Sequence, residues 1–300
     1  MSKLLLTLGI LCGVTFALPS AEITVVGSST VGDVLTRVAQ AWREQGNVAV
    51  VAITGSGSNS ALSALGDGRA VFVTLSRPLT DQEIQAYTTA HGPLISIVIG
   101  YDALAVFVHR DNPLSAITLA QLDGIFGAER RRGGPAIRQW GDLGLGEPWS
   151  ARPLALIGSS RFGGAHALMR ELALQGGPFT TLMTQEPVAS SVVQGVGTDP
   201  AAIGCASVSL VTKRTRVVPI GDTPDRVFLP SAATCYDGSY PLARPLILCW
   251  SPRAVMSEEA RSFFDFVVSP EGQRVIASTG CFPLGRSPEL RNHLPVTDGK

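Results

Sequence analysis

Short apolar runs alternate with amphipathic stretches along the chain, and Ser, Thr and Gly fill several of the joins between them. Residues 22–27 and 47–55 predict strands, because each is a short apolar run bounded by turn residues. Residues 31–46 predict a helix, because apolar side chains recur there on one helical face. That face comprises Val34, Leu35, Val38, Ala41 and Trp42.

The same alternation continues to the end of the chain. A strand at 70–76 precedes a helix that Thr80 is expected to cap, and Glu83 three residues on completes a capping box. Further strands are predicted at 102–114, 154–160, 202–211, 215–221 and 240–252, and further helices at 59–68, 118–127, 163–174 and, as a pair, within 257–280. This order predicts a mainly parallel sheet covered on both faces. Ligands of such sheets bind beyond the carboxyl ends of the strands, where the Ser, Thr and Gly joins fall.

Residues 1–21 have the pattern of a signal peptide. One Lys precedes an apolar run, and small residues suited to a signal peptidase follow it. The run is shorter than the roughly 20 residues that span a membrane. Cleavage is predicted after Ala21, with Ala17 as the alternative, whereas Leu11 before Cys12 disfavours a lipoprotein. We therefore expect an exported, periplasmic protein.

Composition limits the classes of function. The chain has 300 residues, 45% of them hydrophobic, which favours two compact lobes over one. Its 24 basic residues balance 24 acidic ones, and a nucleic-acid-binding surface would leave a basic excess. We therefore expect no nucleic-acid partner.

The cysteines of the exported chain can form disulfides, since its compartment permits them. Cys205 and Cys249 lie in apolar runs and are expected to be buried free thiols. Cys235 lies in a predicted loop and is the one expected to be bridged, although the sequence leaves all pairings with Cys281 and the others open. No CxxC spacing occurs, so a metal site is not predicted.

Two joins between a strand and a helix carry closely spaced hydroxyl groups. Helix N-termini bind anions through backbone amides, and Ser and Thr hydroxyls add short donors, although the same residues also serve as plain helix caps. In "GSSTV" we expect hydroxyls from Ser29 and Thr30 and a backbone N–H from Val31. In "TGSGSNSALSAL" the corresponding candidates are Ser56, Gly57 and Ser58. Both joins are predicted to face one anion.

The order of these motifs carries a family resemblance. The pieces "GSSTV", "TGSGSNSALSAL", "VTLSRPLTDQEI", "ALAVFVHRDNPLSAITLAQLDGIFG", "QWGDLG", "AAIGCASVSL", "YPLARPLILCW" and "FFDFVVSPEGQRVIASTGCFPL" follow one another across nearly the whole exported chain. In this order they resemble the periplasmic phosphate-binding proteins of bacterial ABC-type phosphate transporters. The resemblance implies an α/β protein of the type 2 periplasmic-binding fold, with a ligand cleft between two lobes.

The resemblance also implies how the lobes are divided. After the signal peptide at 1–21, lobe 1 is discontinuous and comprises 22–102 and 245–300, and lobe 2 comprises 103–244. Two crossing strands, Ala103 to Val108 and Arg244 to Cys249, are expected to form the hinge.

A third candidate site element is "TLSRPL", with Ser76 and Arg77. Well-known members of the family have an aspartate just after this Ser, where it accepts a proton from phosphate. Arg77 offers five donors and no acceptor, so it can grip an oxyanion but cannot recognise a ligand proton. The selectivity for phosphate over sulfate is therefore not assured by this position.

The fourth element departs further from the family, which has an Arg and then Ser-Gly-Thr before the helix of the second lobe. Here "LIGSSRFGGAHAL" has Gly158 near the place of that Arg, and Phe162 and Gly164 replace the Ser and Thr. Ser160, Arg161, Gly163 and Gly164 are the remaining candidates on this side. His166, at the start of the helix, is expected to be a surface residue.

No catalytic motif is present: GxSxG, Walker A, HExxH and GxGxxG are all absent from the sequence. The sequence therefore predicts a non-enzymatic, monomeric solute-binding protein without a cofactor. Its expected partners are an inorganic oxyanion, phosphate first, and the membrane permease of an ABC transporter. The alternatives are another tetrahedral oxyanion, a phosphate ester, or a periplasmic sensor or partner-binding module that has lost transport.

Overall fold

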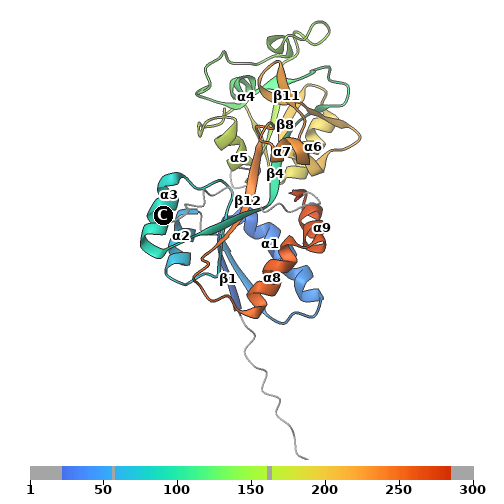
Figure 1. The fold of residues 1–300 in the computed structure, drawn as a ribbon. Helices are drawn as coiled ribbons and strands as arrows, with labels where there is room; N and C mark the ends of the chain where they lie inside the picture. The colour runs from blue at the N-terminus through green and yellow to red at the C-terminus, as the bar shows by residue number, and fades with distance from the viewer. Residues whose placement is uncertain (1–21, 56–57, 161–163, 285–300) are drawn as a thin grey trace, which may run out of the picture.

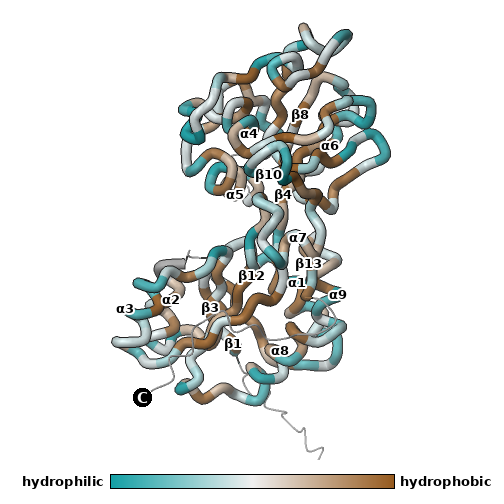
Figure 2. Tube along the Cα trace, turned by 45° about the horizontal axis from the view of Figure 1, so that its top comes forward, coloured by the Kyte–Doolittle hydropathy of each residue, from teal (hydrophilic) through white to brown (hydrophobic). Residues whose placement is uncertain are grey.

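Two groups of helices and strands are joined by a narrow connection in the computed structural model, which describes residues 22–55, 58–160 and 164–284 (Figures 1 and 2). Two strands, β4 (Ile95–His109) and β12 (Ala243–Trp250), run through this connection. They contain the two segments predicted to cross between the lobes. No helix in the described ranges has the length and apolar character needed to cross a membrane.

The first group holds the N-terminal elements together with the last two helices (Figure 1). Its strands are β1 (Glu22–Gly27), β2 (Val50–Gly55) and β3 (Phe72–Leu75), and its helices are α1 (Ser29–Glu44), α2 (Ser58–Gly66), α3 (Asp81–His91), α8 (Glu258–Val268) and α9 (Pro270–Ser278). The expected capping box is present, because the Thr80 side chain accepts from the Glu83 amide and the Glu83 side chain accepts from the Thr80 amide. Local sequence thus specified where α3 begins.

The second group holds the middle of the chain. Its strands are β5 (Ile117–Thr118), β6 (Ala155–Ser159), β7 (Thr184–Glu186), β8 (Ala202–Ser207), β9 (Thr215–Val218), β10 (Ile220–Thr223) and β11 (Arg226–Phe228). Its helices are α4 (Leu119–Phe126), α5 (Gly164–Leu172), α6 (Ala189–Thr198) and α7 (Ala232–Tyr236), with short 3-10 turns at Trp140–Leu143 and Val208–Leu210. A last strand, β13 (Phe282–Pro283), pairs with β4.

The main sheet is mixed, so the prediction of a mainly parallel sheet was wrong. Its strand order is β2-β1-β3-β12-β4-β8-β6-β7. Strands on either side of the centre are parallel, as expected for strands linked by helices. The central pairs are antiparallel, because β12 returns between β3 and β4, and β8 runs against the second half of β4.

The buried side chains form separate clusters in the two groups. Two clusters draw only on residues 23–99 and 246–276, and two others only on residues 103–242. In the first group, Trp42 of α1 packs edge-on against Phe263 of α8 with ring centroids 5.5 Å apart. This contact holds α1 against the C-terminal helices.

The four cysteines of the described residues are free. Cys205 and Cys249 are buried, as predicted, and burial raises the pKa of Cys249 to about 12. The expectation that Cys235 is bridged was wrong, because it lies in helix α7 rather than in a loop and is buried in the core of the second group. A buried, protonated thiol of this kind behaves as a small apolar side chain.

Candidate functional site

The predicted joins lie side by side at the carboxyl ends of parallel strands. Gly27, the last residue of β1, pairs with Gly55 at the end of β2 and with Thr74 in β3. The backbone of Gly27 has φ +143°, and a Cβ at this position would lie 2.1 Å from the Thr74 carbonyl oxygen. Glycine is therefore required where the chain leaves β1 for α1.

The N-terminus of α1 begins directly after this glycine. Ser28 is the N-cap, and its hydroxyl accepts from the Val31 amide at 3.5 Å. Val31 N–H, which was predicted to bind the ligand, is thus directed to the cap. Ser29 is exposed and Thr30 is half-buried, and the first turn of a helix leaves their amides without intrahelical acceptors.

The N-terminus of α5, from the second group, meets that of α1. A Cβ built on Gly164 would lie 3.4 Å from Oγ1 of Thr30 and 3.5 Å from Nη2 of Arg244. Two of the predicted site residues, Thr30 and Gly164, are therefore brought together from elements more than 130 positions apart in the sequence. We call the place where Thr30, Gly164 and Arg244 meet the α1–α5 junction.

Arg244 lies at this junction although the sequence interpretation treated it only as the start of a crossing strand. It lies on β12 directly opposite Asp102 of β4. Its Nε and Nη2 donate to Oδ2 of Asp102 at 3.0 and 2.9 Å, and Nη2 also donates to Oγ1 of Thr30 at 2.9 Å. A signal was present, because "YPLARPLILCW" places one Arg, and "YDALAVFV" one Asp, in otherwise apolar strands.

Arg77 forms an ion pair within the first group. Its Nη2 and Nη1 donate to the two carboxylate oxygens of Glu83 at 2.7 and 2.9 Å, and Nη1 also donates to the Pro78 carbonyl. The hydrogen bonds from Arg77, followed by that from the Thr80 amide, lower the pKa of Glu83 to about 2. Ser76, the neighbouring candidate, is half-buried. An anion-binding role for Arg77 stays a prediction. An anion would have to compete with the Glu83 carboxylate for the Arg77 guanidinium.

This ion pair makes the acid stability of the protein testable. The lowered pKa of Glu83 means that its contribution to stability is present above the unfolded-state value of 4.5 and is lost as the pH falls toward 2. In Arg77→Met the pKa of Glu83 should move back toward 4.5, because its main hydrogen-bond donor is gone. Carboxyl titration by NMR measures this directly.

A matched variant is Arg69→Met, which removes an exposed Arg paired with Asp67 instead. It should leave the titration of Glu83 unchanged. An unchanged Glu83 titration in Arg77→Met would show that the ion pair does not form in solution.

The other candidates of the second group are only partly described. Ser160 is half-buried and its amide donates to the Glu186 carbonyl at 2.8 Å. Ser56, Gly57, Arg161 and Gly163 lie outside the described residues, as does the side chain of Ser58, where α2 begins.

His166 of α5 was predicted to be a surface residue, but it is half-buried. Its ring packs against Phe179 at a tilt of 36° with centroids 4.1 Å apart, and Nδ1 lies 3.3 Å from the Ser159 carbonyl oxygen. Burial lowers the pKa of His166. The side chain therefore helps to fix the start of α5.

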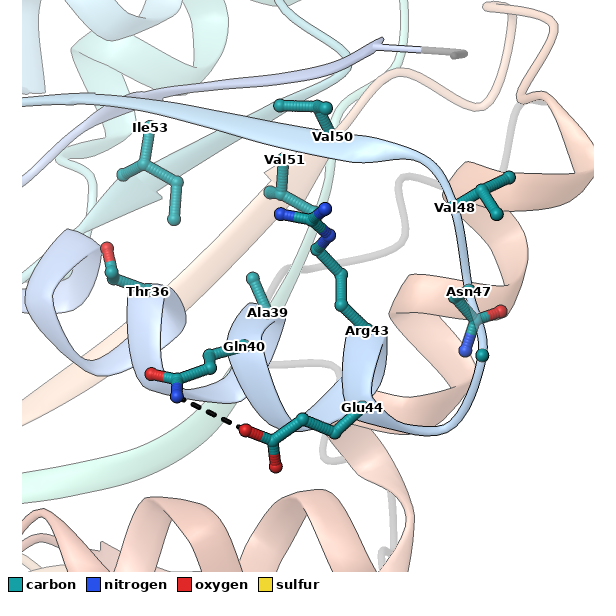
Figure 3. A pocket seen from close by; sticks show the side chains of 11 residues that line it. Thr36, Ala39, Gln40, Arg43, Glu44, Asn47, Val48, Val50, Val51 and Ile53 are labelled. Atoms are coloured by element: carbon teal, nitrogen blue, oxygen red, sulfur yellow. Dashed lines mark hydrogen bonds between the residues drawn. The ribbon is translucent and has the colours of Figure 1, made fainter. Parts of the chain in front are cut away.

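A groove of about 800 Å³ lies elsewhere, between α1 and the edge strand β2 (Figure 3). It is lined by the later turns of α1 and by exposed apolar residues that include Val48 and Val50. Its lining includes the cation Arg43 but also the carboxylate of Glu44, which accepts from Gln40 at 3.2 Å and disfavours an anion. The described residues also hold no cluster of His, Cys, Asp and Glu suited to a metal ion. The α1–α5 junction is therefore the better candidate site.

Comparisons with known proteins agree with this arrangement. A family model described as the PBP superfamily domain matches residues 15–271. The chain is 31% identical to the phosphate-binding protein PstS of Pseudomonas aeruginosa over 270 residues. This alignment covers 88% of this chain and 84% of that protein. The chain belongs to the PBP superfamily.

Solved structures support the same fold for this PBP-superfamily chain. A protein from Planctomyces limnophilus, described as a possible phosphate-binding protein, has a TM-score of 0.75 and 23% identity, over 88% of this chain and 93% of that chain. An ABC-type phosphate transport receptor from Vibrio cholerae has a TM-score of 0.68 and 22% identity, over 87% and 100% of the two chains. The predicted type 2 periplasmic-binding fold is confirmed.

Proposed function

We propose that this chain is a non-enzymatic solute-binding protein that binds phosphate at the α1–α5 junction and delivers it to the permease of an ABC transporter. The observation that carries the proposal is the meeting of two helix N-termini, one from each group of elements, at Thr30 and Gly164. Each N-terminus carries a partial positive charge and free amides, so their convergence favours an anion.

The relatives support phosphate as that anion. The Pseudomonas aeruginosa protein is a phosphate-binding protein, and the Vibrio cholerae structure is of an ABC-type phosphate transport receptor. By this proposal the chain is exported to the periplasm, residues 1–21 are its signal peptide, and it acts as a monomer.

The separate buried clusters support the proposed division into lobes. We assign residues 22–102 and 245–300 to lobe 1 and residues 103–244 to lobe 2. Because β4 and β12 are the strands of the described residues that run through the narrow connection, the lobes can close on a ligand by a small change in these strands. The α1–α5 junction then lies where the lobes meet.

Titration calorimetry of residues 22–300 tests the proposal, with phosphate, sulfate and molybdate as ligands. We expect saturable binding of one phosphate per chain and a higher thermal midpoint in its presence, because a ligand that binds only the folded state stabilises it. Absence of both effects with phosphate would overturn the proposal. Binding of sulfate or molybdate alone would identify a different oxyanion, and binding of no anion would favour a sensor or partner-binding module.

One observation favours a second oxyanion as an additional ligand. Arg77 stands in the position where well-known relatives have an aspartate. Both carboxylate oxygens of its partner Glu83 accept hydrogen bonds from Arg77. No acceptor for a ligand proton is therefore offered by this pair. On this reading sulfate competes with phosphate, and the competition changes little between pH 6 and pH 8.

A further inference from the structure

We infer that Arg244 of the connecting strand β12, rather than Arg77, is the cationic group that binds the oxyanion at the α1–α5 junction. The inference rests on the proposed function and assigns it a ligand-binding residue. Arg244 thereby takes over the role of the arginine that the second-lobe element lacks at Gly158.

The hydrogen bonds of Arg244 leave one end of its guanidinium unused. Nε and one N–H of Nη2 are directed to the same oxygen of Asp102, and the other N–H of Nη2 is directed to Thr30. In the described part of the chain, no group accepts a hydrogen bond from Nη1. Two charge-bearing donors therefore remain beside the N-termini of α1 and α5.

Burial makes this remaining donor group significant. The Arg244 side chain is 9% exposed and the Asp102 side chain 16% exposed. Nη1 is not among the fully buried side-chain atoms of the described residues that lack a hydrogen-bond partner, so the small exposed part of this side chain includes Nη1. Nη1 is therefore accessible to a ligand, and an oxyanion accepts from a planar guanidinium more effectively than a neutral molecule does.

The neighbours of Arg244 give the ligand further donors and a fixed geometry. Asp102 holds the guanidinium in place across the strand pair, and Thr30 accepts from it, so the Thr30 hydroxyl proton is free to be donated elsewhere. Gly164 has no side chain, so α5 can approach Arg244 closely; a Cβ built on Gly164 would lie 3.5 Å from Nη2. The anion would therefore contact both lobes and a connecting strand at once.

Arg77 differs in each of these respects. Its side chain is 36% exposed, and its Nη1 and Nη2 are both bound to Glu83 within the same lobe. An anion at Arg77 would have to displace a carboxylate, whereas an anion at Arg244 Nη1 displaces none.

The test measures phosphate affinity by calorimetry for the wild-type residues 22–300 and for Arg244→Ala, Arg244→Lys, Arg77→Ala and Arg37→Ala. Arg244→Ala should weaken binding about 100-fold, since hydrogen bonds to charged groups are strong and each decade corresponds to about 1.4 kcal/mol. Arg244→Lys should recover part of the affinity, because it keeps the charge but not the fork. Arg77→Ala should change the affinity less than about threefold, as should Arg37→Ala, the control on an exposed part of α1.

Chemical rescue distinguishes a ligand contact from a structural role. Millimolar guanidinium ion should restore part of the phosphate affinity of Arg244→Ala, because it can occupy the vacated space, and should have no effect on Arg37→Ala. If Arg244→Ala does not fold, Arg244→Lys carries the comparison, with an expected loss of about tenfold.

The outcomes separate this inference from the proposed function. Two results would overturn the inference and leave the proposed function standing. In the first, the wild type binds phosphate and folded Arg244→Ala binds it equally well. In the second, the large loss of affinity occurs in Arg77→Ala instead. Binding of another oxyanion that Arg244→Ala abolishes would overturn phosphate as the ligand and support Arg244. If no anion binds the wild type, both fail.

Discussion

Replacing Gly27 by alanine is expected to lower the free energy of unfolding by about 3 kcal/mol, a large effect for one methyl group. A Cβ at this position would lie 2.1 Å from the carbonyl oxygen, 2.8 Å from the hydroxyl and 2.9 Å from the amide nitrogen of Thr74. That carbonyl oxygen accepts from the Ser28 amide at 2.9 Å, so the clash falls on the bond that positions the N-cap of α1. The backbone φ of +143° adds strain for any residue with a Cβ.

Urea unfolding followed by circular dichroism measures this change. Gly46→Ala is the matched control, because Gly46 also has a positive φ, +94°, but a Cβ there would meet nothing within 4 Å. It should cost only about 1 kcal/mol, from backbone strain alone. Equal losses in the two variants would show that the contact with Thr74 is unimportant. Gly27→Ala should also weaken phosphate binding, because it displaces the N-terminus of α1.

Replacing Gly164 by valine is expected to weaken phosphate binding at least 30-fold, whereas alanine should change it less than about threefold. An alanine Cβ would make ordinary contacts of 3.4 Å with Thr30 and 3.5 Å with Arg244. The two additional methyl groups of valine would displace one of these partners or α5 itself. Since Gly164 is an exposed residue at the start of α5, its replacement by alanine should alter the free energy of unfolding by no more than about 0.5 kcal/mol.

Calorimetry with phosphate, beside thermal unfolding of the ligand-free protein, separates the two effects. Gly134→Val is the control, because Gly134 has no atom within 4 Å of a built Cβ and lies in a surface loop. It should leave the affinity unchanged. Wild-type affinity in Gly164→Val would place the ligand away from the α1–α5 junction.

The helix starts show how much local sequence determines. The capping box at Thr80 and the amphipathic face around Trp42 follow from residues a few positions apart, and the structure confirms them. The grouping of the Ser, Thr and Gly joins at the carboxyl ends of β1, β2 and β3 also follows, because strands linked by helices run parallel. These features depend on short-range backbone geometry, which a sequence pattern records directly.

Tertiary structure alone decided which side chains meet at the site. Arg244 lies 142 residues from Asp102 and 214 residues from Thr30, and no periodicity links such positions. Their contact depends on β12 returning antiparallel beside β4, the pairing that sequence alternation failed to predict. Arg77 was likewise identified as a donor, but its capture by Glu83 depends on two side-chain conformations and not on spacing. The sequence by itself therefore determined the strands and helices that flank the first two joins, the cap of α3 and the family. Strand register and side-chain packing determined which cation remains available for an anion.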